Sequence, residues 1–199
     1  MDFAERRDKA LALIQRVHEG QTRADGSVPA WHHLDRVSLL LRLVLEASGE
    51  GTDEEREDIA LAGLGHDAVE DTEVTEEELR EAFGERGVAL IMGMTNRLGD
   101  DEDVAPYVRQ VAAAEEGVRL IKLADLYDNC TSVLYDLFVL KPQWAEGWFL
   151  PIVEPMIAAV LPTTFTRFPA AAERLKAMVR SSHAMLKNEC VRYKERGVV

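Results

Sequence analysis

The sequence predicts an all-α fold, and three observations support that prediction. Apolar residues recur every three to four positions through most of the chain, which is the spacing of one helix face. The segments TDEE (52–55) and TEEE (75–78) have the form of capping boxes, in which a threonine and a glutamate close the first turn of a helix. No segment alternates apolar and polar residues as a half-buried strand would. We therefore expect a bundle of helices around one core.

The first half of the chain divides into helices at glycine, proline and capping signals. The first helix ends near Gly20, and a turn-rich loop with two glycines and a proline follows it. The second ends at Gly49. The two capping boxes then begin a central helix and a short helix that stops near Gly84, and an acidic surface loop, 99–103, comes later. The expected helices span about residues 2–18, 31–48, 52–71, 75–84 and 86–96.

The second half is expected to hold one long core helix and several shorter ones. A proline begins a helix at about 106–117, and the helix at 118–140 is apolar almost all round. Five prolines then break the chain into short pieces before a last amphipathic helix at about 170–196. We divide the chain into a domain at 1–140 and a C-terminal helical extension at 141–199 on the same core. The aromatic and methionine residues of the extension belong either to that core or to the face of a homodimer.

Charge and composition exclude several classes of protein. The formal net charge of −13 argues against a general nucleic-acid binder, because that activity depends on basic patches. The charged N-terminus does not resemble a signal peptide, and no apolar run reaches the roughly 18 residues that a membrane span requires. Two widely spaced cysteines fit neither a disulfide framework nor a thiolate metal site. We therefore expect a cytoplasmic protein that binds neither membranes nor nucleic acid.

A group of four ionisable residues ends an apolar run at 66–71. If the helix continues at about 100° per residue, His66 and Glu70 lie one turn apart on one edge, and Asp67 and Asp71 lie on the adjoining edge. A histidine beside a carboxylate can form half of a metal site, with the second carboxylate pair within reach of a metal-bound water. The alternatives are a solvated helix end at the second pair and a buried hydrogen-bonded pair at the first.

Two other segments offer residues that could complete such a site. Asp125 lies in the apolar core helix, where a carboxylate is costly to bury unless it is paired, hydrogen-bonded or bound to a metal. It is therefore a metal ligand, a helix cap or a partner of Lys122. Asn129 lies one turn further on the same face. On the second helix, His33 follows the apolar spacing, whereas His32 lies on a more exposed edge and is read as a bystander.

Together these segments resemble the HD superfamily of metal-dependent phosphohydrolases. HDAVEDT (66–72) and EVTEEELREAFG (73–84) resemble the hydrolase domain of RelA/SpoT-type guanosine tetraphosphate enzymes and their small stand-alone relatives. HEGQTRADG (18–26) and PAWHH (29–33) are similar to the segment before the family's first metal ligand. IKLADLYDN (121–129) is similar to its closing word, IKLADRxHN. The resemblance covers most of the first two thirds of the chain.

The resemblance implies an HD-domain helical bundle with additional C-terminal helices and one divalent cation. Two imidazoles with two carboxylates suit manganese, iron or zinc better than calcium, and the resemblance implies Mn²⁺. The metal would bind a water and a phosphate oxygen, and Glu70 and Asp71 would orient or deprotonate that water and return a proton to the leaving group. The implied metal ligands are His33, His66, Asp67 and Asp125.

The implied substrate is guanosine tetra- or pentaphosphate, which would lose its 3′-pyrophosphate. Arg23 stands where the family has a substrate-contacting basic residue in the loop before the first ligand. Lys122 and Asn129 complete the expected substrate-binding residues. The protein is thus expected to act on a small nucleotide, without a separate synthetase domain.

Three departures from the family pattern concern the substrate more than the metal. Ala24 stands in place of a second basic residue, Leu126 in place of an arginine and Asp128 in place of a histidine. Two alternatives therefore stay open: an HD phosphohydrolase that acts on other nucleotides, and a non-catalytic nucleotide-binding regulator. The intact pair of Glu70 and Asp71 argues against the regulator, because a protein that only binds has no need of it.

Overall fold

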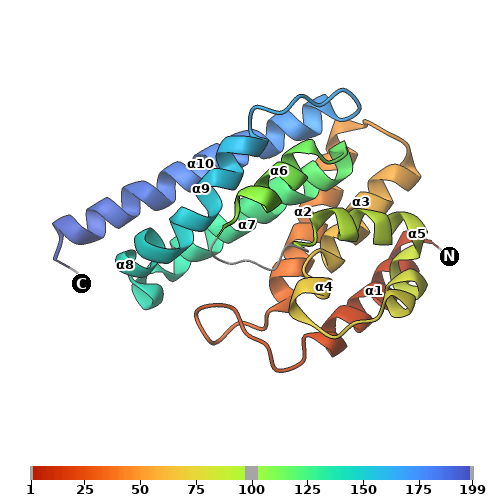
Figure 1. Ribbon diagram of the computed structural model, residues 1–199, viewed down its shortest axis with the longest axis horizontal. Helices are drawn as coiled ribbons and strands as arrows, with labels where there is room; N and C mark the ends of the chain where they lie inside the picture. Colours follow the sequence, from red (N-terminus) through yellow and green to blue (C-terminus); the bar gives the residue numbers. More distant parts are fainter. Residues whose placement is uncertain (1, 97–102, 198–199) are drawn as a thin grey trace.

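The computed structural model describes residues 2–96 and 103–197, and its regular structure is helical (Figure 1). Within those residues the only β-type pairing is an isolated bridge between Thr22 and Pro29, which closes the loop before the second helix. The predicted all-α fold is therefore confirmed. No helix in this described part of the chain is long and apolar enough to cross a membrane.

Helices α1 to α5 form the compact part of the molecule, on the right in Figure 1. Both predicted capping boxes are present: the side chains of Thr52 and Thr75 each accept a hydrogen bond from the backbone N–H of the glutamate three residues later. Such a cap stabilises a helix by about 1 kcal/mol. Gly49 ends α2 in the left-handed conformation, with φ 67°. The bounds are α1 Phe3–Val17, α2 Trp31–Ser48, α3 Asp53–Gly65, α4 Ala68–Asp71 and α5 Glu76–Met94.

The later helices form the elongated part, on the left in Figure 1, where α10 lies along α7. Prolines start or interrupt several of these helices, as the sequence predicts. Buried apolar residues of α2, α3, α5, α7 and α10 form one continuous core. The bounds are α6 Ala105–Ala113, α7 Glu116–Leu140, α8 Pro142–Trp144, the π-helix η1 Ala145–Phe149, α9 Leu150–Val160 and α10 Pro169–Glu195.

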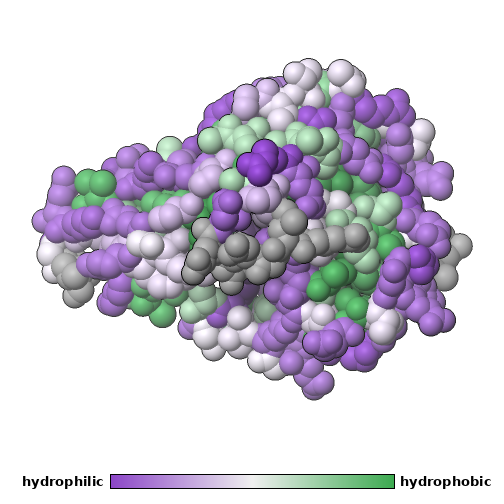
Figure 2. All heavy atoms as spheres, viewed as in Figure 1, coloured by the Kyte–Doolittle hydropathy of each residue, from purple (hydrophilic) through white to green (hydrophobic). Residues whose placement is uncertain are grey.

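Two glutamates, Glu50 just before α3 and Glu116 at the start of α7, hold the start of α10. The carboxylate of Glu116 accepts hydrogen bonds from the backbone N–H groups of Thr166 (2.6 Å) and Phe168 (3.0 Å), and Glu50 accepts one from Ala171 (3.0 Å). A carboxylate at a helix N-terminus satisfies free N–H groups and opposes the helix dipole. These contacts join the C-terminal segment to the α3 and α7 end of the molecule. Figure 2 shows a mostly hydrophilic face, in keeping with the net charge of −13.

Two glycines let α3 lie close to its neighbours just before the predicted site. A Cβ atom on Gly63 would lie 2.5 Å from Leu41 Cδ1 on α2. A Cβ atom on Gly65 would lie 2.7 Å from Ile91 Cδ1 on α5. A side chain at either position would force these neighbours to move, and at Gly65 it would also meet the Phe83 ring at 2.9 Å, so the two glycines allow the close packing of the helix end before His66.

The prediction of one unbroken helix at 52–71 is wrong. Helix α3 ends at Gly65, and the short α4 begins only at Ala68. The His66 imidazole binds the backbone carbonyl of Gly63 (2.8 Å), a local bond of the kind that competes with regular helix. The backbone N–H of Glu70 accordingly donates to the Asp67 carbonyl, three residues back (3.1 Å). The four polar residues are therefore arranged by a turn and not by one helix face.

Other boundaries differ from the prediction by a few residues: the helix expected to reach Gly117 ends at Ala113, and the next begins at Glu116. The helix stop predicted at Gly84 appears as a kink within α5, where Gly84 has φ 71° and ψ 171°. Most of the predicted acidic loop, 99–103, falls outside the described residues.

Candidate metal centre and adjoining cavity

Two buried histidines from different helices meet at the centre of the molecule. His33 lies in the first turn of α2 and His66 in the turn after α3, and their ring centroids are 5.1 Å apart. The Nδ1 atom of His66 lies 2.8 Å from the Gly63 carbonyl oxygen, and Nδ1 of His33 lies 2.7 Å from Asp128 Oδ2. Carbonyl and carboxylate oxygens only accept, so each Nδ1 carries a hydrogen and donates it. In the neutral imidazoles each Nε2 is then a bare lone pair.

Both Nε2 lone pairs face carboxylate oxygens. Asp125 Oδ1 lies 3.1 Å from Nε2 of His33 and 3.5 Å from Nε2 of His66. Oxygens of Asp67 lie 3.7 Å and 3.2 Å from the same two nitrogens. Neither Nε2 has a hydrogen-bond partner among the described residues, although both are buried. Four acceptor groups thus point at one another, an arrangement that is favourable only with positive charge between them.

The donor set fits a transition-metal ion. Ligand atoms of His33, His66 and Asp125 lie within 4.8 Å of one another, and Asp67 adds a fourth donor beside both imidazoles. Two imidazole nitrogens and carboxylate oxygens suit manganese, iron or zinc. The protonation of His66 points the same way: burial lowers its pKa, but the charges of Asp67 and Asp125 outweigh burial and raise that pKa to about 9. In the absence of a metal, a proton on His66 supplies the positive charge that the two carboxylates favour at this position.

The structure pairs Asp125 with Lys122, one of the alternatives offered by the sequence, and also places it beside both imidazoles. It faces the imidazoles through Oδ1, while its Oδ2 lies 2.9 Å from the ammonium of Lys122. Asn129 donates a hydrogen bond of 2.6 Å to Oδ1. Burial raises the pKa of this carboxyl, yet Lys122 and the imidazoles hold it well below its usual range. Asp125 is therefore an anion at neutral pH. Lys122 also approaches the Tyr107 hydroxyl (3.3 Å).

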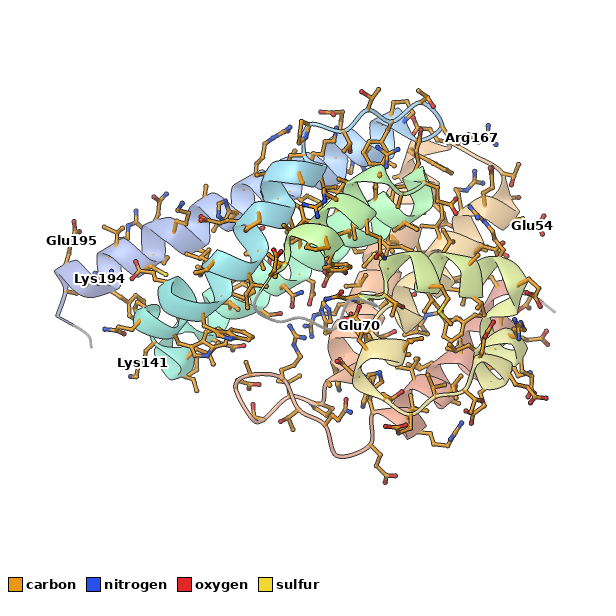
Figure 3. All side chains as sticks on the ribbon, in the orientation of Figure 1. Glu54, Glu70, Lys141, Arg167, Lys194 and Glu195 are labelled. Carbon is orange, nitrogen blue, oxygen red and sulfur yellow. The ribbon has the colours of Figure 1, made fainter. Side chains whose placement is uncertain are left out.

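Glu70, labelled in Figure 3, and Asp71 lie on the short helix α4, which follows the turn of His66 and Asp67. Glu70 accepts a hydrogen bond from the backbone N–H of Asn96 (2.5 Å). The backbone carbonyl of Asp71 accepts one from the side-chain amide of Gln21 (2.8 Å). Loss of hydration raises the pKa of both carboxyls, and the nearby charge of Asp67 raises them further. A raised pKa suits a group that exchanges protons near neutral pH.

A cavity of about 650 Å³ opens beside the metal centre. Its polar side holds Asp71 and Asp125 together with all three predicted substrate-binding residues. Arg23 reaches into it from the loop before α2 and donates a hydrogen bond of 2.5 Å to Asn129. The opposite wall is apolar and comes from the C-terminal part of the chain, including Trp148 and Ile152. Glu70 lies outside this lining and borders a second, polar cavity of about 490 Å³ that shares Asp71.

The structure places His33, and not His32, in the cluster, and it corrects one interpretation. His32 stacks on Trp31, with ring centroids 3.9 Å apart, and takes no part in the cluster. The replacement of the family's histidine by Asp128 does not remove a positive charge from the substrate pocket, because position 128 lies behind His33 and outside the lining of the larger cavity. Leu126 does line that cavity, and only 2% of it is exposed.

Sequence reasoning missed several residues that build this site. Asp128 accepts a hydrogen bond from the outer nitrogen of His33, and Arg36 holds Asp128; the only signal was that each lies one helix turn from an expected ligand. Gly63 and Gly65 bring His66 into the core, a role that the pattern GLGHD suggests only once the neighbouring helices are known. The apolar wall of the cavity comes from the segment after residue 140, where the sequence pattern gave the least information about function.

The fold and site define a helical domain with a buried His/Asp cluster that could hold a metal, and comparisons with known proteins give its family. A family model described as the HD domain matches residues 10–128. The chain belongs to the HD domain family, which confirms the resemblance read from the sequence.

The region that matches this chain makes up different shares of the named relatives. A GTP pyrophosphokinase of Myxococcus xanthus is 33% identical over 132 residues, which is 61% of this chain but 16% of that protein. The guanosine-3′,5′-bis(diphosphate) 3′-pyrophosphohydrolase MESH1 of Drosophila melanogaster is 31% identical over 134 residues, 66% of this chain and 67% of that protein. The chain therefore spans about a sixth of the larger relative and two thirds of the smaller.

A solved structure shares the fold over nearly the whole chain. It was described as a metazoan ortholog of SpoT that hydrolyses ppGpp, and it matches 98% of this chain and 97% of its own with a TM-score of 0.65. At 22% sequence identity this similarity concerns the fold. The match extends through α8, α9 and α10, so that these helices also have counterparts in that structure.

Proposed function

We propose that the protein is a metal-dependent phosphohydrolase that removes the 3′-pyrophosphate of guanosine tetra- or pentaphosphate. The observation that carries this proposal is the convergence of the Nε2 atoms of two buried imidazoles and the oxygens of two carboxylates beside a cavity with basic groups. The names of relatives such as MESH1 support the choice of substrate. The membership of the HD domain family supports the choice of metal chemistry.

One divalent cation, Mn²⁺ by preference and Fe²⁺ or Zn²⁺ as alternatives, would be held by the two imidazoles and the two carboxylates that face them. When bound, such a cation lowers the pKa of a coordinated water and neutralises phosphate charge. The protein supplies the orientation of the donors: Gly63 and Asp128 fix the two rings, and Lys122 and Asn129 fix Asp125. The proposed ligands are His33, His66, Asp67 and Asp125.

Basic and amide groups of the cavity would bind the phosphates. Lys122 lies within reach of any oxygen that approaches Asp125, and its ammonium has donors to spare beyond that ion pair. Arg23 now binds the neutral amide of Asn129, and a phosphate is a stronger partner for a guanidinium than an amide is. The substrate thus replaces contacts that already hold these side chains in place, which limits the cost of ordering them.

Asp71 and Glu70 would move the protons of the reaction. Water oxygen bonds to the phosphorus next to the ribose, the bond from that phosphorus to the 3′ oxygen breaks, and pyrophosphate leaves. One proton is lost by the water, and one is gained by the 3′ oxygen. Asp71 is the nearer candidate, since it lines the same cavity as Asp125. Glu70 borders the adjoining cavity and acts through Asp71 or a bridging water.

A second candidate is hydrolysis of a different nucleotide, and the cavity wall favours it. Leu126 replaces an arginine of the family pattern and lies in the lining, with Trp148 and Ile152 opposite. Apolar and aromatic side chains gain from contact with a base or another uncharged group, whereas they offer nothing to a second pyrophosphate. The body of the substrate would then lie on this wall, and its reacting phosphate would lie at Asp125.

A substrate screen tests both candidates. The purified protein is incubated with Mn²⁺ and with guanosine tetraphosphate, nucleoside triphosphates or nucleoside monophosphates, and released phosphate and pyrophosphate are measured separately. We expect pyrophosphate and GDP from the tetraphosphate, and loss of both on addition of a chelator. Release of phosphate from another nucleotide supports the second candidate. Tight nucleotide binding without any release would instead support the regulator.

A further inference from the structure

Helices α2 and α7 meet through two pairs of polar residues, each spaced one turn apart. His33 and Arg36 face Asp125 and Asp128. The His33 ring lies between the two aspartates: Nε2 is 3.1 Å from Asp125 Oδ1, and Nδ1 is 2.7 Å from Asp128 Oδ2. The i, i+3 spacing on α7 puts both carboxylates on one face, at a separation that spans an imidazole. One helix therefore contacts both nitrogens of the ring that the other helix supplies.

We propose that Asp128 is a positioning residue that fixes His33 in the metal-binding tautomer. The carboxylate accepts the Nδ1 hydrogen, which leaves the Nε2 lone pair directed at Asp125 and Asp67. A carboxylate on the outer nitrogen also makes the imidazole a stronger electron donor toward a metal. This inference rests on the metal site of the proposed function, but it concerns residues to which the resemblance gave no such role.

The two histidines differ in how their orientation is set. His66 donates its Nδ1 hydrogen to a backbone carbonyl, so its orientation is set by the turn after α3. His33 donates to a side chain, so its orientation depends on the residue at position 128. The family word has a histidine there, and an imidazole offers at most one acceptor and no negative charge. The aspartate is therefore a feature of this chain and not of the pattern that it resembles.

Arg36 provides the opposite charge that the buried carboxylate of Asp128 needs. Its Nε and NH2 groups donate to the two oxygens of Asp128 at 2.7 Å and 2.8 Å, a bidentate contact. Asp128 is 7% exposed, and a carboxylate buried to that extent needs a partner of opposite charge. The bidentate contact with Arg36 therefore leaves the carboxylate behind His33 without an unpaired charge.

Substitutions at position 128 separate the acceptor from the charge. Asp128→Leu removes both, so His33 is free to take either tautomer, and the Kd for Mn²⁺ should rise by about 10- to 100-fold, as for other residues that orient metal ligands. Asp128→Asn keeps an oxygen that can accept from Nδ1, so its effect should be smaller. Asp136→Asn is the matched control, because it removes a negative charge from the same helix and from the surroundings of the same Arg36. The control should bind Mn²⁺ like the wild type.

The experiment combines Mn²⁺ titration by calorimetry with nitrogen NMR of the histidine rings in the metal-free protein. We expect the Nδ1-protonated form of His33 in the wild type and a mixture of tautomers in Asp128→Leu. Asp128→Asn should show a smaller shift toward the mixture, and it replaces the leucine variant in the test if that variant does not fold. Wild-type Mn²⁺ affinity in Asp128→Leu, or an unchanged His33 tautomer in both variants, overturns the inference. Failure of the wild type to bind Mn²⁺ would instead count against the proposed function, and the tautomer measurement would still test Asp128.

Discussion

His66→Ala should abolish the stabilisation of the protein by a divalent metal. The imidazole is buried, its Nδ1 is held by the Gly63 carbonyl, and its Nε2 lies 3.2 Å from Asp67 and 3.5 Å from Asp125. Without the ring, one nitrogen donor is lost and the two carboxylates keep only His33 between them. The variant therefore removes a ligand while the rest of the cluster stays in place.

The size of the effect follows from linkage between binding and folding. A ligand at 100 times its Kd stabilises the folded state by about 2.7 kcal/mol. For a chain of 199 residues, each kcal/mol moves the melting temperature by roughly 2–4 °C, so Mn²⁺ should raise that of the wild type by roughly 5–11 °C. If loss of one ligand weakens binding about a thousandfold, the same metal concentration adds less than about 0.1 kcal/mol. The variant should then show no measurable shift.

Thermal unfolding with and without Mn²⁺, after treatment with a chelator, measures this difference. Each protein is compared with itself, because the lost hydrogen bond to Gly63 alone costs about 1–3 kcal/mol. His32→Ala is the matched control: it removes an imidazole next to His33 that stacks on Trp31. The control should keep the full shift. An equal shift in His66→Ala and the wild type would refute the assignment of His66 as a ligand.

Three further predictions concern catalysis, substrate choice and stability. Glu70→Ala should keep its metal but lose at least about 100-fold in turnover, the usual scale for a positioned acid or base; unchanged turnover would reduce the residue to a helix end. Leu126→Arg should lower the KM for guanosine tetraphosphate, because it adds a guanidinium to the cavity lining, and an unchanged KM would mean that the departure is neutral. The hydrogen bond from Arg167 lowers the pKa of Glu55 to about 2 from 4.5, so this pair stabilises the fold above pH 4.5 and the stabilisation is lost as the pH falls toward 2. Glu55→Gln should therefore lower the free energy of unfolding at pH 7 by well under about 1 kcal/mol, since the pair is exposed, and by less near pH 2. Glu54→Gln is the control. An equal loss of stability at both pH values would contradict the ion pair.

Local signals were sufficient to predict most of the fold. Threonine capping boxes, glycines at helix ends and prolines at helix starts act within a few residues, so the bounds of α2 and α10 and the start of α3 follow from short segments of sequence. The break at His66 does not follow from such signals. It depends on a ring that binds its own backbone and on Gly63 and Gly65, whose neighbours come from other helices. A periodic pattern alone continues the helix through that turn.

The candidate site divides in the same way. Residues inside recognisable words, such as His33 and Asp125, were found because their chemistry is costly in a core. Arg36 and Asp128 were not found, since their roles appear only when α2 and α7 are placed side by side. The division at residue 140 and a homodimer stay predictions, which limited proteolysis and analytical ultracentrifugation can test.

The central claim is that one metal ion held by His33, His66, Asp67 and Asp125 is required for hydrolysis. It is tested most directly by titrating the metal-free protein with Mn²⁺ and measuring bound metal and pyrophosphate release from guanosine tetraphosphate on the same samples. The account predicts that release rises in proportion to bound Mn²⁺ and reaches its maximum at one ion per chain, with Asp125→Asn showing neither. Full release from the metal-free protein, or release that does not follow occupancy of this one site, would contradict it.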